Sequence, residues 1–216
     1  MLLKEEREQV IKIALKAQNM GLIALTFGNF SLRDPETGHI CITPSGMDYE
    51  DLDPADIVVV DEHGKIIEGS RTPSIETPMH TMVYRKRKDV FGVAHTHSVF
   101  ATVWASCDLE FPVIASELAA LVGEPVKTAP YQRMGSVELA ETVTETLQDK
   151  AAVLMSNHGL LAVGTNLKTA FSNAVIVEEA AKITFYAHMM GHLKALPLDE
   201  CRTLRQLVLD KYGQKK

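Results

Sequence analysis

Stretches with apolar residues at helical spacing alternate along the chain with short, nearly continuous apolar runs. The helical spacing is clear over residues 4–20, where Val10, Ala14 and Ala17 share one face and Gly21 follows as a stop signal. The short apolar runs are bounded by turn residues and predict strands. Further helices are expected at 72–88, 100–106, 115–123, 137–150, 167–191 and 199–216. Strands are expected at 29–34, 39–45, on both sides of a turn within 56–69, and at 90–98, 151–159 and 160–164.

This order of elements predicts the fold class. Strands cluster in the first half but recur after residue 90, with helices between them, which favours a layered α/β domain with a largely antiparallel sheet. The strictly alternating units of a Rossmann fold or a TIM barrel are missing. A length of 216 residues without an evident repeat or linker suits one domain with a full core, so we expect a single domain over residues 1–216.

Composition and charge limit the cellular compartment and the binding partners that we expect. The first residues, MLLKEEREQV, carry too many charges for a signal peptide, and no apolar run approaches the ~18 residues of a membrane span. The formal net charge of −6 disfavours nucleic acid or an anionic membrane as the main partner. Three widely separated cysteines argue against a disulfide framework. We therefore expect a cytoplasmic protein with neither nucleic acid nor a membrane as its partner.

The stretch GVAHTHS is the first sign of chemistry. His95 and His97 are two residues apart, so on a strand both imidazoles point to the same face. His158 ends a second apolar run, and Glu76 lies in the predicted helix before the first run. Three histidines and one carboxylate are a donor set typical of Zn²⁺, although imidazole also binds other divalent ions.

The other five histidines are more typical of packed or surface residues. His80 shares a helix face with Glu76, four residues earlier, but no second helical partner supports it as a ligand. His188 and His192 form an i, i+4 pair at a predicted helix end without a nearby carboxylate. We therefore do not include them in the predicted metal site.

Three turns made of small residues suggest anion binding. They are GNFS (28–31), TPSGM (43–47) and TPS (72–74), whose backbone N–H groups could form anion nests. Each is weak alone, because glycine, serine and proline also mark ordinary turns. Their presence in one chain with a candidate metal site favours a phosphorylated substrate.

The ordered set G-N-F-S, I-T-P-S-G, P-S-x-E, H-T-H, A-P-Y and N-H-G resembles the class II aldolase/adducin family over nearly the whole chain. The resemblance implies a three-layer α/β/α domain with a central mixed, mostly antiparallel sheet. It also implies a homotetramer with active sites at subunit interfaces. The implied activity is a zinc-dependent lyase reaction that cleaves a ketose 1-phosphate, above all L-fuculose 1-phosphate in fucose degradation, to dihydroxyacetone phosphate and L-lactaldehyde.

The same resemblance implies roles for individual residues. His95, His97 and His158 match the ligands of one zinc ion per subunit, while Glu76 matches a carboxylate that touches the metal at rest and acts as catalytic base. Tyr212 matches a mobile tyrosine that assists proton transfer to the aldehyde oxygen. The positions that match the substrate-phosphate pocket are Gly28, Asn29, Ser45, Gly46 and Ser74.

Two departures from the family pattern leave alternatives open. Ile75 stands where a second pocket serine is frequent, and Ser116 stands at the place of an interface tyrosine, so either Ser116 or Glu117 takes that role. The same fold also serves L-ribulose-5-phosphate 4-epimerases, methylthioribulose-1-phosphate dehydratases and the non-enzymatic adducin head. Because the two enzyme families carry Asp or Cys at the position of Glu76, that glutamate favours the aldolase.

Overall fold

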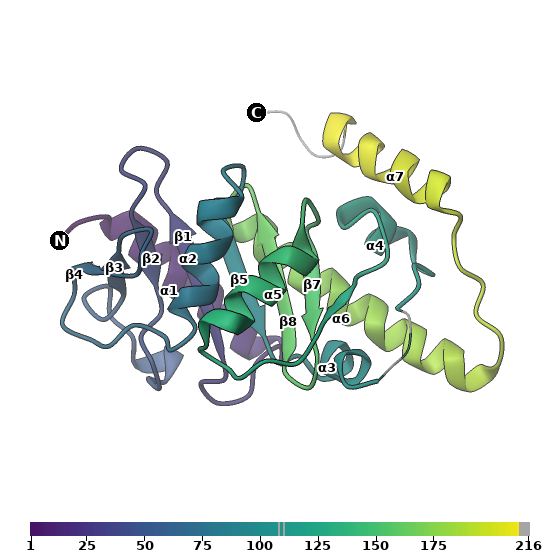
Figure 1. Ribbon diagram of the computed structural model, residues 1–216, viewed down its shortest axis with the longest axis horizontal. Helices are drawn as coiled ribbons and strands as arrows, with labels where there is room; N and C mark the ends of the chain where they lie inside the picture. Colours follow the sequence, from purple (N-terminus) through teal and green to yellow (C-terminus); the bar gives the residue numbers. More distant parts are fainter. Residues whose placement is uncertain (108, 110, 212–216) are drawn as a thin grey trace.

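The computed structural model describes residues 1–211 except 108 and 110, and its centre is an open sheet (Figure 1). Eight strands lie in the described residues, in the order β4-β3-β2-β1-β5-β8-β7-β6. All neighbouring pairs are antiparallel except β6 and β7, which confirms a mixed, mostly antiparallel sheet. The strands are β1 (Gly28–Arg33), β2 (Ile40–Ile42), β3 (Val58–Val60), β4 (Ile66–Glu68), β5 (Gly92–Thr96), β6 (Thr128–Ala129), β7 (Ala152–Met155) and β8 (Gly159–Gly164).

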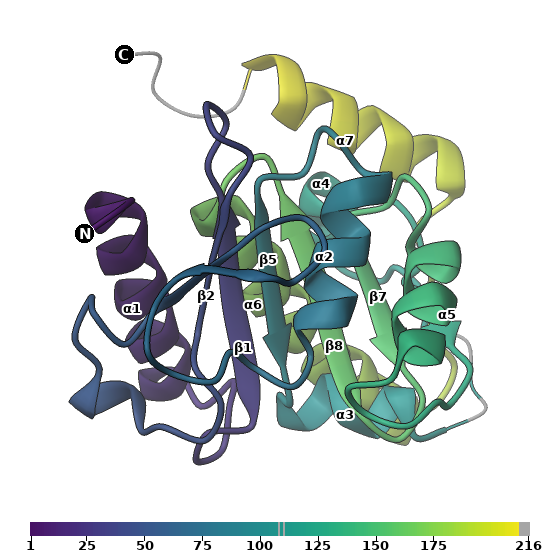
Figure 2. The same cartoon turned by 60° about the vertical axis from the view of Figure 1, so that its left-hand side comes forward.

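Helices cover both faces of this sheet, as Figures 1 and 2 show from two sides. They are α1 (Lys4–Asn19), α2 (Thr77–Lys86), α3 (Val99–Ala105), α4 (Ser116–Leu121), α5 (Val137–Leu147), α6 (Leu167–Met190) and α7 (Leu198–Lys211), with a short 3₁₀ turn, η1 (Tyr49–Asp51). The pair α2 and α5 lies on one face, α1, α3 and α6 lie on the other, and α7 packs on α4. The described helices include none with both the length and the apolar character that crossing a bilayer requires.

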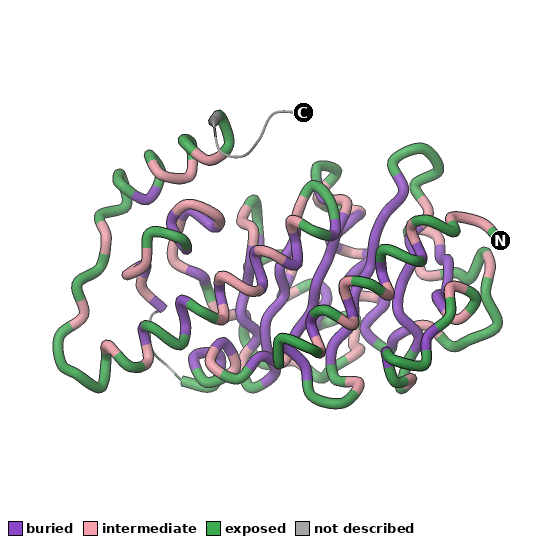
Figure 3. The backbone as a smooth tube through the Cα atoms, turned by 180° about the vertical axis from the view of Figure 1, so that it is seen from behind, coloured by how far each residue is buried: buried purple, intermediate pink, exposed green. Residues whose placement is uncertain are grey.

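The hydrophobic core has two parts because successive strand residues point to opposite faces. Val93 and Leu161 join the cluster under α2 and α5, whereas their neighbours Ala94 and Leu160 join the cluster under α1, α3 and α6. Both faces of the central strands are therefore buried, as the tube in Figure 3 shows. This explains why these strands appear in the sequence as continuous apolar runs, and it confirms the three-layer α/β/α class.

The structure differs from the predicted boundaries mainly around residues 43–77. The helix expected from residue 72 begins at Thr77, since Pro78 occupies its first turn, where a missing N–H costs nothing. Glu76 thus lies immediately before α2 and not within it. The strand expected over 39–45 ends at Ile42, because Pro44 forms an isolated antiparallel bridge with Pro73. The two-residue strand β6 is too short for a periodic pattern, and the sequence did not predict it.

Candidate active site

Several chain segments meet at one edge of the sheet because of its antiparallel register. β5 and β7 both end there, and β1 and β8 begin there, so His97, His158 and Gly28 are neighbours. Residue pairing also places Asn29 of β1 directly opposite His95 of β5. This edge leads into α3, at the lower side of the sheet in Figure 1. The predicted site residues thus come from distant parts of the sequence.

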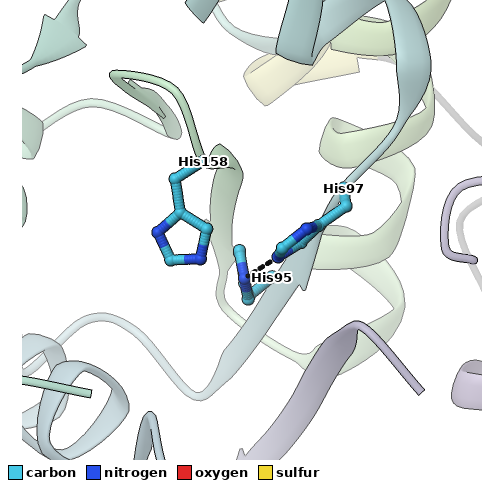
Figure 4. A group of neighbouring side chains, drawn as sticks. All are labelled: His95, His97 and His158. Carbon is cyan, nitrogen blue, oxygen red and sulfur yellow. Dashed lines mark hydrogen bonds between the residues drawn. The ribbon is translucent and has the colours of Figure 1, made fainter. Parts of the chain in front are cut away.

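The three histidines form a compact cluster at this edge (Figure 4). Their ring centroids are 4.8 to 5.0 Å apart, and one nitrogen of each lies within 4.8 Å of the others. His95 is fully buried, and its Nδ1 lies 2.9 Å from the carbonyl oxygen of Leu160. Because a carbonyl can only accept, Nδ1 carries the hydrogen and Nε2 of His95 is free to bind a metal.

Glu76 completes the cluster with a buried carboxylate. Its Oε2 lies 2.9 Å from Nε2 of His95, and its Oε1 lies 3.4 Å from Nε2 of His158. Burial raises the pKa of the carboxyl, but the charge and hydrogen bond of His95, with smaller contributions from His158 and Asn29, hold this pKa well below its usual range. Glu76 is therefore ionised at neutral pH.

The electrostatics of the cluster suit a cation. Burial and the nearby His95 lower the pKa of His97 to about 3 and that of His158 to about 4, so both imidazoles are neutral at neutral pH. Among the described residues, the buried Oε1 of Glu76 has no hydrogen-bond partner. Burial lowers the pKa of His95, but the charge and hydrogen bond of Glu76 raise it overall, so this imidazole carries the positive charge next to the carboxylate. A divalent ion supplies positive charge at the same place, and three imidazole nitrogens and a carboxylate with an unsatisfied oxygen fit such an ion, which would be held by His95, His97, His158 and Glu76.

A cavity of about 210 Å³ opens beside the cluster. Glu76, His97 and His158 lie in its wall, with hydrophobic side chains such as Phe27 and Met134. The same wall contains all five positions expected for phosphate, namely Gly28, Asn29, Ser45, Gly46 and Ser74. The structure therefore brings the candidate phosphate pocket and the candidate metal ligands into one space.

Two of the small-residue turns are joined directly. The backbone N–H of Ser45 donates to the carbonyl of Thr72 at 3.0 Å, and the N–H of Ser74 donates to the carbonyl of Thr43 at 3.0 Å. Thr43 in turn donates its backbone N–H to the carbonyl of Phe30 in β1. These bonds fix the TPSGM and TPS turns side by side next to GNFS, a relation that the sequence pattern could not show.

Two glycines permit the close approach of these segments. A Cβ on Gly159, the residue after His158, would lie 2.4 Å from the carbonyl oxygen of Thr96, the residue after His95. Gly28 has a φ of 154°, and a Cβ there would lie 2.4 Å from the side chain of Ile23. Glycine is therefore required at both positions for geometric reasons.

The structure does not bring every predicted residue to this cavity. Glu117 is exposed in the first turn of α4, and within the described residues both it and Ser116 lie outside the cavity wall. Tyr212 lies outside the described residues. A larger cavity of about 570 Å³ is lined by charged residues of α7 and the segments facing it, but it contains none of the candidate ligands, so the chemistry points to the smaller one.

Sequence reasoning missed a group of buried polar residues behind the site. His80 is completely buried, and its ring nitrogens contact Asn29 and Ser31 at 2.6 Å each. Ser31 also contacts the hydroxyl of Tyr84 at 2.8 Å. The four-residue spacing of Glu76, His80 and Tyr84 was the available signal, since it places all three on one side of a helix.

The sequence and the fold of this chain are both similar to those of known aldolases. Residues 8–185 match the family model described as Class II Aldolase and Adducin N-terminal domain. A 5-deoxy-D-ribulose 1-phosphate aldolase of Bacillus thuringiensis serovar kurstaki is 40% identical over 215 residues, covering 100% of both chains. The structure of an L-fuculose 1-phosphate aldolase matches with a TM-score of 0.90 and 35% identity, covering 94% of this chain and 95% of the other. The L-fuculose-1-phosphate aldolase of Thermus thermophilus matches with a TM-score of 0.75 and 28% identity, over 88% and 98% of the two chains.

Proposed function

Because the chain belongs to the class II aldolase and adducin family and is an aldehyde-lyase of the sugar-phosphate type, we propose that it cleaves a ketose 1-phosphate to dihydroxyacetone phosphate and a short aldehyde. The observation that carries this proposal is the position of Glu76. Its ionised carboxylate faces two imidazole nitrogens at 2.9 and 3.4 Å in the wall of a cavity that also contains the small-residue turns.

The metal in this proposal is one Zn²⁺ ion per chain, held by His95, His97, His158 and, in the resting enzyme, Glu76. Three neutral nitrogen ligands and one exchangeable oxygen ligand are the donor set of catalytic zinc sites. When bound, the ion supplies a Lewis acid for the negative charge that develops on the oxygens at C2 and C3.

Glu76 moves the proton in the proposed reaction. As the C3–C4 bond breaks, the C4 hydroxyl gives up its proton and becomes the aldehyde oxygen, while the bonding electron pair stays on C3. Glu76, after taking up a proton, delivers it to C3 to complete dihydroxyacetone phosphate and returns to the carboxylate form. In the synthetic direction the Glu76 carboxylate removes the same proton from C3. The low pKa that its neighbours impose keeps Glu76 in the carboxylate form between turnovers.

The substrate phosphate is proposed to bind in the joined turns. The hydroxyls of Ser45 and Ser74 offer neutral donors, while Gly46, with a φ of 68° and open space around it, lets the backbone approach an anion. Since the phosphate is unchanged in the reaction, its binding energy serves to position C2 and C3.

The aldehyde end is proposed to be completed by residues from a neighbouring subunit of a homotetramer. Glu117 is exposed at the surface of this chain and could reach a neighbour's site, and Tyr212 is the second group proposed for this end. Replacing Glu117 by Gln or Tyr212 by Phe should lower kcat more than it changes metal affinity. Unchanged kcat for either variant would remove that residue from the proposal.

Two substrates should be compared directly. L-Fuculose 1-phosphate would release L-lactaldehyde, and 5-deoxy-D-ribulose 1-phosphate would release acetaldehyde; both leave the same three-carbon phosphate. The 40% identity to the aldolase named for the second sugar makes it as strong a candidate as the first. Cleavage of each should be measured as dihydroxyacetone phosphate release, with and without a chelator.

Epimerisation of L-ribulose 5-phosphate is the control for a different reaction on the same fold. We expect cleavage of at least one 1-phosphate, loss of activity with the chelator, and recovery with Zn²⁺. Epimerisation without cleavage would overturn the proposed function, and purified active enzyme without a bound divalent ion would overturn the metal assignment.

A further inference from the structure

A row of polar residues joins α2 to β1 inside an otherwise apolar layer. Glu76, immediately before α2, and His80 and Tyr84 within it are spaced by four, and Asn29 and Ser31 are spaced by two on β1. Four helical residues advance about 6 Å and two strand residues about 6.6 Å, so the two rows stay in register. All five side chains are buried.

The hydrogen bonds of this row run in one direction. Nδ2 of Asn29 donates to Oε2 of Glu76 at 3.1 Å, so Oδ1 of Asn29 is the acceptor that faces His80. Nε2 of His80, 2.6 Å from that oxygen, must therefore carry the hydrogen. Nδ1 of His80 is then the acceptor for the Ser31 hydroxyl, 2.6 Å away.

Tyr84 closes the far end of the row. Because the Ser31 hydroxyl gives its hydrogen to His80, the Tyr84 hydroxyl is the donor toward Ser31, whose Oγ and carbonyl oxygen lie 2.8 and 3.0 Å away. Burial raises the pKa of the phenol, which keeps it protonated as a donor. Burial, together with the nearby His95, lowers the pKa of His80 to about 3, so its imidazole remains neutral with one acceptor and one donor.

The opposite polarity would place two acceptors face to face. If His80 carried its hydrogen on Nδ1, Asn29 would have to turn its amide to donate to Nε2. Its carbonyl oxygen would then face the Glu76 carboxylate, and two buried acceptors at about 3 Å repel each other. The tautomer of His80 therefore controls which group of Asn29 meets Glu76.

We propose that His80 is a positioning residue for the reaction: through Asn29 it holds the Glu76 carboxylate by Oε2 and leaves Oε1 free toward His158 and the cavity. The inference rests on the proposed role of Glu76, but the hydrogen-bond polarity itself does not depend on that role. His80 touches neither the substrate cavity nor the candidate metal ligands through a hydrogen bond among the described residues.

Two isosteric variants separate positioning from simple structural support. The amide nitrogen of His80→Gln can replace Nε2 and donate to Asn29, whereas the amide oxygen of His80→Asn can replace only Nδ1 and accept from Ser31. Each variant leaves one buried partner without its bond, so a purely structural role predicts equal losses. Positioning predicts that His80→Asn lowers kcat about 10- to 100-fold, as for other groups that orient ligands, and that His80→Gln stays close to the wild type.

The KM value for the sugar phosphate provides a second readout. We expect kcat to fall by a larger factor than KM rises in His80→Asn, because of the five candidate phosphate positions only Asn29 loses a hydrogen bond, while Gly28, Ser45, Gly46 and Ser74 remain in place. Zn²⁺ affinity, measured by competition with a chromophoric chelator, should also be weaker in His80→Asn than in His80→Gln. His63→Gln is the matched control: its side chain is 73% exposed, and we expect no change in any readout.

The tautomer can be observed directly by ¹⁵N NMR of histidine-labelled protein with Zn²⁺ bound, with the His80 signals identified by their loss in His80→Gln. We expect a protonated Nε2 and an unprotonated Nδ1 at neutral pH. Equal losses in the two variants, or an Nδ1–H tautomer, would overturn this inference. A wild-type chain that folds, binds zinc and shows the expected tautomer but cleaves no sugar phosphate would instead contradict the proposed function alone.

Discussion

The two ends of strand β1 carry buried polar groups that are satisfied to very different degrees. At one end, Arg33 donates through its terminal nitrogens to four backbone carbonyls, including those of Tyr84 at 2.8 Å and Val90 at 2.6 Å. At the other end, Asn29 donates to the Glu76 carboxylate, beside a cluster in which one nitrogen of each of three histidines lies within 4.8 Å of the others. Among the described residues, this second end contains a buried carboxylate oxygen, Oε1 of Glu76, that accepts no hydrogen bond.

This difference indicates which buried cluster is structural and which is functional. The Arg33 guanidinium satisfies carbonyls where the chain leaves α2, and it lies over the rings of Tyr84 and Phe91, 5.2 and 4.7 Å from their centroids. Its Nε alone lacks a partner among the described residues. The cluster at Asn29 needs a cation or a substrate to become satisfied, and it borders a cavity. Mutations at the two ends should therefore affect different quantities.

The largest effect should come from Glu76→Gln. The amide keeps the size of the side chain but cannot carry the proton at C3, so we expect kcat to fall about 10²- to 10⁴-fold. The melting temperature should change by only a few degrees, as measured by thermal unfolding of both proteins. Glu36→Gln, in the exposed turn beyond the Arg33 end, is the control and should keep wild-type kcat. Near-normal turnover in Glu76→Gln would exclude Glu76 as the base.

Arg33→Met should show the opposite pattern. The methionine fills similar space but leaves the buried carbonyls of Tyr84, Lys88 and Val90 without their donor, which should cost about 3 kcal/mol of unfolding free energy. Urea denaturation measures this loss, and kcat per folded molecule should change by less than about threefold, since the cavity wall is intact. Arg71→Met removes an exposed arginine and should be nearly neutral. A stable but inactive Arg33→Met would show that the two ends are not separable.

Zinc should stabilise the folded chain only by binding to the histidine cluster at the Asn29 end of β1. A ligand that binds the folded chain at 100 times its Kd adds about 2.7 kcal/mol to the unfolding free energy. We expect the melting temperature of the protein, freed of metal by a chelator that is then removed, to rise when zinc is added. This rise should be lost in His158→Ala but kept in His63→Ala. An equal rise in His158→Ala would place the stabilising ion elsewhere.

Much of the fold could be predicted because its strands and helices carry strong local patterns. The apolar run before His95 and the spacing of Val10, Ala14 and Ala17 predict the elements observed there, and the layered class is confirmed. The end of the strand expected over 39–45 was misplaced because it depends on the bridge between Pro44 and Pro73, which is a long-range contact. Local patterns do not contain such contacts.

In the site, too, features with a local sequence pattern could be predicted and features that depend on long-range contacts could not. Histidines at strand ends and the shared motifs predict that His95, His97, His158 and Glu76 meet, and the structure brings them together; their roles remain predictions. The link from His80 to Asn29 was missed because it depends on the register between α2 and β1. Periodicity predicts that a face of a helix is buried, but not which strand residue it meets.

The smallest predicted effect is a difference between the two ends of β1 in how the unfolding free energy depends on pH. Because the pKa of His80 is lowered to about 3, the unfolded chain takes up a proton near pH 6.5 while the folded chain does not, so stability falls as the pH drops below 6.5. This loss reaches about 1.4 kcal/mol between pH 7.5 and 5.5, and His80→Gln should lack it. Urea denaturation of the chelated proteins at both pH values measures the difference, to which His97 and His158 contribute equally in both chains. Arg33→Met should keep the wild-type pH dependence of the unfolding free energy, because the guanidinium is charged throughout this range. A smaller pH dependence in Arg33→Met, as in His80→Gln, would show that the acid sensitivity is not specific to the Asn29 end.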